Sequence, residues 1–258
     1  MTKSALFTLL VCAVLAAAFL LFPWPLQQKL FAVAYGLDPQ RPTHSYFIAG
    51  MQIPLEARKL GMFGGFLLTY LYLLALRRGR AANFPPASVS ALLLGFIATM
   101  GLDGLNATLF DLGLPNAYAP VLALRLATGL LAGIAMAGLL LPAFNGTMWH
   151  DVSPLPSLRN MGEAAGALAL AVCFFAIVDA RPAILYYPVA ILGITGLVTE
   201  LTLINSIIAM VLGRRVGMAR TLQDALPAFA AGLILTTCEL AVMSAVHYVM
   251  LGDMAGLM

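Results

Sequence analysis

The chain has 258 residues, of which 62% are apolar and 10% are charged. Ordinary soluble domains contain about 45–50% apolar and about 25% charged residues, so this composition excludes a soluble fold and makes the lipid bilayer the solvent for most of the chain. The formal net charge of +3 comes without a long run of Lys or Arg, which excludes nucleic acid as a partner.

Apolar segments long enough to cross a bilayer recur along the whole chain. A membrane-spanning helix needs about 20 mostly apolar residues. The candidate segments are 5–23, 57–77, 87–105, 119–143, 161–180, 184–212 and 225–251. The first is too long for the roughly 7–15-residue apolar core of a signal peptide, so we expect an uncleaved anchor. The sequence therefore predicts an all-α, polytopic membrane helix bundle that forms one domain over residues 1–258.

The distribution of Lys and Arg among the connections orients this bundle, because short cytoplasmic loops are enriched in both. If the N-terminus is inside, the cytoplasmic basic residues are Lys3, Arg77, Arg78, Arg80, Arg159, Arg214, Arg215 and Arg220. The opposite side receives Lys29, Arg41, Arg58, Lys59 and Arg181, mostly in the one long connection after the first segment. We therefore expect about seven spans, a cytoplasmic N-terminus and an extracytoplasmic C-terminus.

Residues 25–56 form the only long connection, and we expect it on the extracytoplasmic side. Apolar residues recur at helical spacing between positions 26 and 37, which predicts a short helix along the outer interface. Residues 38–44 are polar and contain two prolines, which is typical of a turn-rich loop. The connection 145–160 is expected to be an ordinary cytoplasmic loop.

The cysteine and histidine spacings do not indicate a metal site or a cofactor. Cys12, Cys173 and Cys238 lie far apart inside apolar segments, and neither C-x-x-C nor H-E-x-x-H occurs. We expect the three thiols to be buried as small apolar groups. The sequence also lacks a Gly-rich phosphate loop and a nucleophile elbow. We therefore predict no catalytic residues, no metal and no cofactor.

Ionisable residues inside the apolar segments are the candidates for function, because a charge that faces lipid is costly. Arg125 lies about two turns into the fourth segment and shares a face with Gly129 and Gly133. Such small residues let helices approach closely. We therefore expect Arg125 to point into the bundle.

Two further charges are expected near Arg125. Asp103 lies close to the outer end of the third segment, with Asn106 three residues later, and Arg58 opens the second segment. In the predicted orientation all of these fall in the outer half of the membrane, beneath the polar loop. Two guanidinium groups and one carboxylate leave a net positive charge, and guanidinium groups bind phosphate or carboxylate well.

We therefore predict an anion-binding site. Its residues are Arg58, Asp103, Asn106, Arg125, Arg41 and His44. An ion-pair cluster that only fixes helix packing is the alternative interpretation.

Glu200 and Glu239 lie deeper, in the sixth and seventh segments. Burial favours the protonated form of a carboxyl group. Each is therefore either a neutral carboxyl that is bonded to a neighbouring helix, or part of a proton relay or an ion site.

Three stretches carry a family resemblance: residues 57–61 (Ala-Arg-Lys-Leu-Gly), Asp103-Gly104, and residues 125–133 (Arg-Leu-Ala-Thr-Gly-Leu-Leu-Ala-Gly). Over residues 38–140 the chain resembles an uncharacterised family of prokaryotic membrane proteins, catalogued as domain of unknown function 2085. Many members have two cysteines around the first motif, and this chain has none there. The resemblance implies a multi-pass protein of a prokaryotic plasma membrane and implies no activity.

The function expected from these residues is non-enzymatic. The first hypothesis is a membrane protein that binds an anionic small molecule or lipid headgroup at its outer side, as a transporter would. The second is a non-catalytic accessory subunit of a larger membrane complex. An intramembrane enzyme that uses Glu200 or Glu239 ranks last, because no nucleophile or metal ligand accompanies them. The expected partners are membrane lipids, and other membrane subunits under the second hypothesis.

Overall fold

The computed structural model describes residues 3–251, and the chain is mostly helical, as predicted. Its α-helices are α1 (Lys3–Leu21), α2 (Leu26–Tyr35), α3 (Ala57–Ala75), α4 (Ala87–Asp111), α5 (Leu122–Met148), α6 (Met161–Ala180), α7 (Tyr186–Leu212) and α8 (Leu222–Leu251). Short strands occur in the connections: β1 (Phe47–Ile48), β2 (Met51–Gln52), β3 (Ala81–Asn83) and β4 (Ser153–Pro156). Single 3-10 turns at Pro42–His44 and Ala183–Leu185 precede β1 and α7.

Five helices within residues 3–251 are long and apolar enough to cross a membrane: α4, α5, α6, α8, and α7 together with the turn before it. Helix α1 has a shorter apolar part, Leu6–Leu21, and α3 carries Arg58 and Lys59 in its first turn. The helical class and the repeated apolar helices agree with the sequence analysis. The number of seven spans and the orientation stay predictions.

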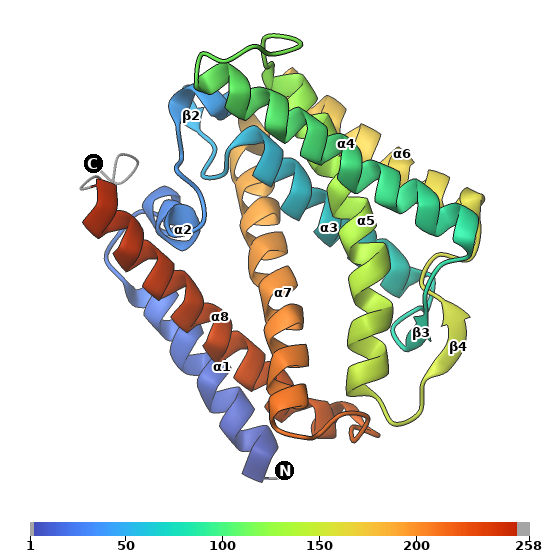
Figure 1. Ribbon diagram of the computed structural model, residues 1–258. Helices are drawn as coiled ribbons and strands as arrows, with labels where there is room; N and C mark the ends of the chain where they lie inside the picture. Colours follow the sequence, from blue (N-terminus) through green and yellow to red (C-terminus); the bar gives the residue numbers. More distant parts are fainter. Residues whose placement is uncertain (1–2, 252–258) are drawn as a thin grey trace.

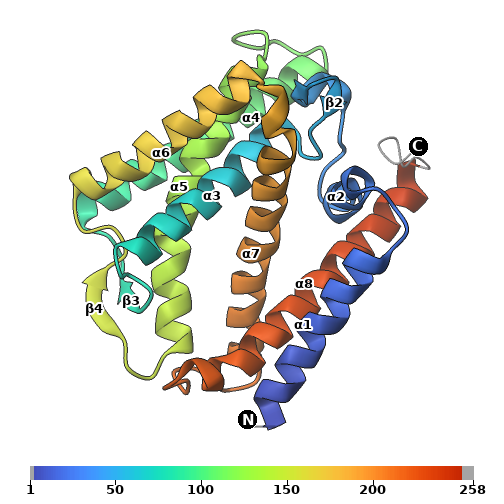
Figure 2. The ribbon, with the colours of Figure 1, turned by 180° about the vertical axis from the view of Figure 1, so that it is seen from behind.

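Helices α3, α5 and α7 lie at the centre of the bundle (Figures 1 and 2). Helices α4 and α6 lie along one side of them, and α1, α2 and α8 lie along the other. The β1–β2 hairpin and the α4–α5 connection are at the end of the molecule where α8 finishes, and α1 begins at the opposite end. Because the long helices run between these two ends, residues of α3, α4 and α5 that are distant in sequence meet at one end.

Helices α3 and α5 approach each other at four glycines. A Cβ atom on Gly61 or Gly65 would meet main-chain atoms of α5, and one on Gly129 or Gly133 would meet main-chain atoms of α3. The contact at Gly129 is with the carbonyl of Arg58. This is the packing that the glycine spacing predicted, and it sets the first turns of α3 and α5 side by side.

The prediction of buried cysteines was wrong, because Cys12, Cys173 and Cys238 are all exposed on the protein surface. Each belongs to an apolar helix, and the outer faces of such helices are as apolar as their inner faces when lipid is the solvent. Hydrophobicity alone therefore does not tell whether a side chain faces lipid or protein.

The connection 145–160 is more ordered than expected. Helix α5 continues to Met148, and β4 pairs in parallel with β3, with Ser153 opposite Ala81. The side-chain amide of Asn145 donates to the carbonyls of Arg78 and Ala81, which ties this end of α5 to the β3 segment. The sequence pattern did not reveal this pairing, because the strands are very short.

Candidate functional site

Asp103 of α4 is the centre of a polar cluster that joins α3, α4 and α5. Its side chain is 3% exposed. Arg58 Nη2 donates to Asp103 Oδ2 at 2.6 Å, and the Tyr118 hydroxyl donates to Oδ1 at 2.7 Å. The Thr128 hydroxyl lies 3.2 Å from Oδ2. The carboxylate is therefore well supplied with donors, which offsets the cost of burying its charge.

The sequence analysis missed Tyr118 and Thr128. Thr128 lies within the motif at residues 125–133, and the only signal for its role was that it lies one turn after Arg125. Tyr118 is in the α4–α5 connection, for which sequence spacing predicts no position. Removal of its hydroxyl from water, together with the bond to Asp103, raises the pKa of Tyr118.

Helix α4 leaves room for the Arg58 side chain at Gly104. A Cβ atom at that position would stand 3.6 Å from Arg58 Nη1, in contact with the guanidinium group. A Cβ atom would thus be at ordinary van der Waals distance, so the guanidinium lies directly against α4 next to Asp103 without requiring the glycine. Arg58 Nε is buried and has no hydrogen-bond partner in the part of the chain that the structure describes.

Arg125 does not pair with Asp103. It is 8% exposed and forms no hydrogen bond or ion pair through its side chain within residues 3–251. It shares its face of α5 with Gly129 and Gly133, which face α3, so it lies on the side of α5 that meets the start of α3. The neighbouring charge that acts on it electrostatically is another cation, Arg41. Arg125 is therefore a largely buried arginine without a counterion among the described residues, and its guanidinium nitrogens still reach the surface.

Arg41 and His44, in contrast, are paired within the protein. Arg41 Nε donates to Glu56 Oε1 at 2.9 Å, and this bond is the main cause that raises the pKa of Arg41. Arg41 Nη1 and His44 Nε2 lie 3.5 Å and 3.3 Å from the same carboxylate oxygen of Asp111. These contacts tie the polar loop to the last turn of α4, beside the Asp103 cluster.

The amide of Asn106 is also used inside the protein. Its Oδ1 accepts from the backbone N–H of Ala117 at 2.8 Å, and its Nδ2 donates to the carbonyl of Tyr118 at 2.9 Å. Asn106 thereby holds the α4–α5 connection above the cluster and positions Tyr118 for its bond to Asp103. The structure assigns it a positioning contact rather than a free amide.

Asp38 organises the connection that covers this end, and sequence reasoning missed it. It is fully buried and accepts hydrogen bonds from the backbone N–H groups of Gln40 and Glu56, both at 2.9 Å. Lys59 Nζ lies 3.8 Å away. Burial raises the pKa of Asp38, and the charge of Lys59 opposes that shift.

Glu200 and Glu239 are separate from this cluster and from each other. Glu200 is 1% exposed and has no hydrogen-bond partner among the described residues. Glu239 is exposed, and its Oε2 accepts from Asn205 Nδ2 at 2.9 Å. Asn205 follows Glu200 by five residues, which places the two side chains on different faces of α7. The structure therefore does not connect them as one relay.

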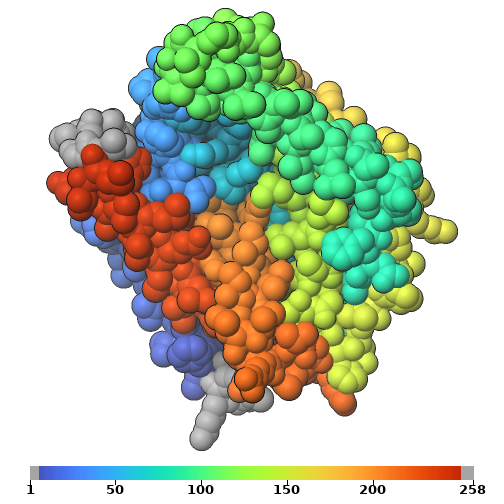
Figure 3. All heavy atoms as spheres, viewed as in Figure 1, coloured from blue at the N-terminus to red at the C-terminus, as the bar shows by residue number. Residues whose placement is uncertain are grey.

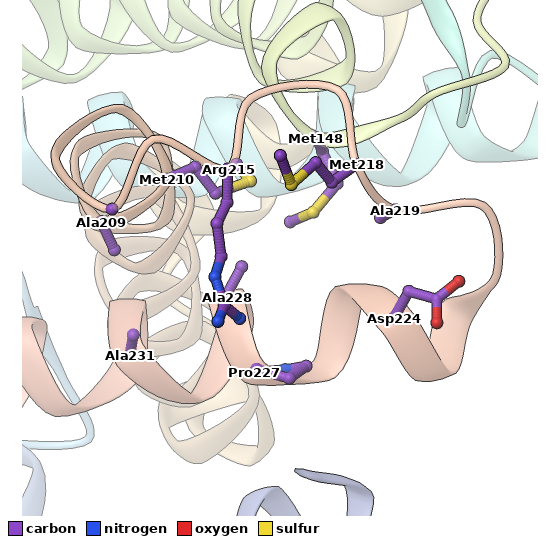
Figure 4. Close-up of a pocket in the computed structure, with 11 residues that line it drawn as sticks. Met148, Ala209, Met210, Arg215, Met218, Ala219, Asp224, Pro227, Ala228 and Ala231 are labelled. Carbon is purple, nitrogen blue, oxygen red and sulfur yellow. The ribbon is translucent and has the colours of Figure 1, made fainter. Parts of the chain in front are cut away.

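A cavity of about 500 Å³ lies at the other end of the bundle, between the ends of α5 and α7 and the start of α8. Met148, Met210 and Met218 line one part of it, and the side chain of Arg215 reaches from the α7–α8 connection toward Ala228 of α8 (Figure 4). None of the site residues predicted from the sequence lines this cavity. Within residues 3–251, no group of three His, Cys, Asp or Glu side chains is placed to hold a metal ion.

One family model matches the chain, over residues 39–139, and its description is "Predicted membrane protein (DUF2085)". This is the family and the region that the sequence motifs indicated. The matched region contains Arg41, Arg58, Asp103 and Arg125, and it ends within α5. No curated protein and no solved structure matches the chain. The match and the five apolar helices together identify a multi-pass membrane protein.

Proposed function

We propose that this protein binds an anionic group at the end of the bundle formed by the starts of α3 and α5 and the end of α4. The group is a phosphate or carboxylate, carried by a small molecule or by a lipid headgroup. The observation that carries the proposal is Arg125, a largely buried arginine whose guanidinium reaches the surface and has no counterion within the described chain.

The cost of burying a charge supports this proposal. An ionised side chain that leaves water loses its hydration, and the loss is offset only when an opposite charge or several hydrogen bonds replace the water. Asp103 has such partners, whereas Arg125 has none in the part of the chain that the structure describes. An anionic ligand would supply the missing charge.

The neighbouring groups favour an anion over a cation. The carboxylates nearby are already engaged, because Asp103 is bonded to Arg58, and Glu56 and Asp111 are bonded to Arg41. Arg58 Nε has no hydrogen-bond partner within residues 3–251, although it lies below the surface. Helix α3 also begins here without a side-chain cap, and the positive end of a helix dipole attracts anions.

The membrane topology in this proposal has seven crossings, made by α1 and α3 to α8, with the N-terminus in the cytoplasm. The helix ends alternate between the two ends of the molecule in Figures 1 and 2, which supports an odd number of crossings. The lower hydropathy of α3 is consistent with a crossing helix, because protein encloses it: Leu60, Phe63 and Phe66 are all buried. The anion site then faces the outer side of the membrane.

The decisive variant is Arg125→Met, which keeps the length of the side chain and removes the charge. Native mass spectrometry would compare retention of phosphatidylglycerol by the wild type and the variant, and thermal unfolding would compare stabilisation by inorganic phosphate. We expect the variant to lose anion-dependent binding and stabilisation by about tenfold or more, which corresponds to roughly 1.4 kcal/mol. If the wild type retains phosphatidylglycerol but is not stabilised by inorganic phosphate, the ligand is a lipid headgroup. If inorganic phosphate stabilises it and the lipid is not retained, the ligand is a free anion.

The matched control is Arg159→Met, at an exposed arginine in the α5–α6 connection. It should leave both measurements unchanged. Equal retention of anionic lipid and equal phosphate stabilisation in wild type and in folded Arg125→Met would refute the proposal. Co-purification of another membrane protein whose carboxylate pairs with Arg125 would also refute it and would favour an accessory subunit of a larger complex.

A further inference from the structure

A carboxylic acid lies in the middle of α8, far from both ends of the helix. Glu239 is followed by 12 more residues of α8. At about 1.5 Å per residue, it therefore lies roughly 18 Å from the nearer helix end. The helix is among those long and apolar enough to cross a membrane. Glu239 is thus placed near the centre of the hydrocarbon layer, where ionisable residues are rare and usually functional.

Where α7 and α8 contact each other, polar side chains of both helices lie next to this position. The two helices approach closely at Gly232, where a Cβ atom would meet Thr202 and Ser206 of α7. One turn later, Asn205 Nδ2 donates to Thr236 Oγ1 at 3.0 Å and to Glu239 Oε2 at 2.9 Å. Thr236 is 1% exposed. Asn205 therefore ties the glutamate to α7 through a buried bridge.

The Glu239 side chain is nevertheless open at the surface. Its position is exposed, and the residues on either side of it along the same face, Leu235 and Val242, are exposed as well. Figure 3 shows α8 on the outside of the molecule beside α7. A carboxyl group here meets lipid on one side and a single amide donor on the other.

No positive charge within residues 3–251 balances this carboxyl group. The ionisable residues of α1, α2, α7 and α8, apart from the end residue Lys3, are Cys12, Lys29, Tyr35, Tyr186, Tyr187, Glu200, Asp224, Cys238, His247 and Tyr248. None of them forms a hydrogen bond or an ion pair with Glu239. Lys29 is bonded to the carbonyl of Leu20, and His247 to that of Tyr35.

We propose that Glu239 is a reversible proton-binding site near the centre of the membrane, held by Asn205 and reached from the lipid-facing surface of α8. A bound proton removes the charge that lipid opposes, and the Asn205 amide stabilises the carboxylate after the proton leaves. A metal cation fits less well, because Asn205 presents N–H donors rather than its oxygen to both Thr236 and Glu239. This inference is independent of the anion site, which involves other helices.

Labelling with dicyclohexylcarbodiimide tests the proposal. This apolar reagent enters lipid, and a protonated carboxyl group adds across one of its C=N bonds: a C–O bond forms and the proton moves to nitrogen. The full chain in phosphatidylcholine vesicles would be labelled at several pH values and mapped by mass spectrometry. We expect label at Glu239 that falls as the pH rises, complete loss of label at this position in Glu239→Gln, and a different extent of labelling in Asn205→Leu, in which the amide donor is absent.

A water-soluble carbodiimide that modifies the exposed Asp151 to the same extent in each variant shows that the proteins remain comparable. The proposal is overturned if a folded wild type carries no label at Glu239, or if the label does not depend on pH. Protection by sodium ions would indicate a metal-cation site instead. Protection in native membranes but not in purified vesicles would indicate that another protein covers this face.

Discussion

Asp103 and Arg125 lie in the same region of the bundle, but only the charge of Asp103 is balanced by other side chains within residues 3–251. Asp103 accepts from Arg58 and from Tyr118, so its charge is balanced inside the fold. Arg125 has no such partner within residues 3–251. Removal of the Arg125 charge and removal of the Asp103 charge should therefore have opposite effects on the stability of the protein. Without ligand, Arg125→Met should unfold at the same temperature as the wild type or at a higher one, because it removes an uncompensated charge from a largely buried side chain.

Removal of the Asp103 charge should have the reverse effect. In Asp103→Asn, the amide oxygen still accepts from Tyr118, but Arg58 loses its counterion. Breaking a buried pair in this way costs about 3 kcal/mol. Chemical unfolding in detergent would measure the loss. The double variant Asp103→Asn with Arg58→Met should recover most of the lost stability, because no unpaired charge of Arg58 remains. If the double variant is no more stable than Asp103→Asn alone, loss of the ion pair is not the cause of the destabilisation.

At the scale of the elements, the contact between α3 and α5 positions the site. In Gly129→Ala, the added methyl group would overlap the carbonyl of Arg58, so the helices must separate. We expect a loss of about 1–3 kcal/mol, as for overpacked cores, measured by thermal unfolding. Gly95→Ala on α4 is the matched control, because no atom lies within 4 Å of the added group. There the change should stabilise the helix by up to about 1 kcal/mol. Equal effects at the two positions would contradict the packing argument.

The spacing of glycines predicted this helix contact, because the helical period of about 3.6 residues and the small size of glycine can both be read from the sequence of a single helix. The same reasoning could not find Tyr118, whose position depends on how Asn106 holds an irregular connection. It also placed Arg125 in the right region but not its bonding, since spacing specifies a face and not a partner. The exposed cysteines mark a related limit: in lipid, an apolar residue faces inward or outward at similar cost.

For the whole molecule, the sequence established the helical membrane class through composition and segment length. The connection after α3 adds a feature that composition did not reveal: Arg78 Nη2 donates to Glu163 Oε1 at 2.7 Å and joins this connection to α6. Arg78 was counted only as a cytoplasmic charge. This partly buried ion pair just after α3 and the Asp103 cluster at its start hold the two ends of α3, which lies between α5 and α7 (Figures 1 and 2).

The orientation of the bundle determines whether the Asp103 cluster faces the outer side of the membrane or the cytoplasm. The accessibility of introduced cysteines can test this orientation. The native cysteines would first be replaced by alanine. Asn116→Cys, in the exposed α4–α5 connection, should then react with a membrane-impermeant maleimide added to intact cells. Leu155→Cys, on β4, should react only after the cells are permeabilised, because α5 separates the two positions by one crossing. The reverse pattern would place the anion site on the cytoplasmic side. Reaction of both cysteines from outside would mean that α5 does not cross, and the seven-span arrangement would then be wrong.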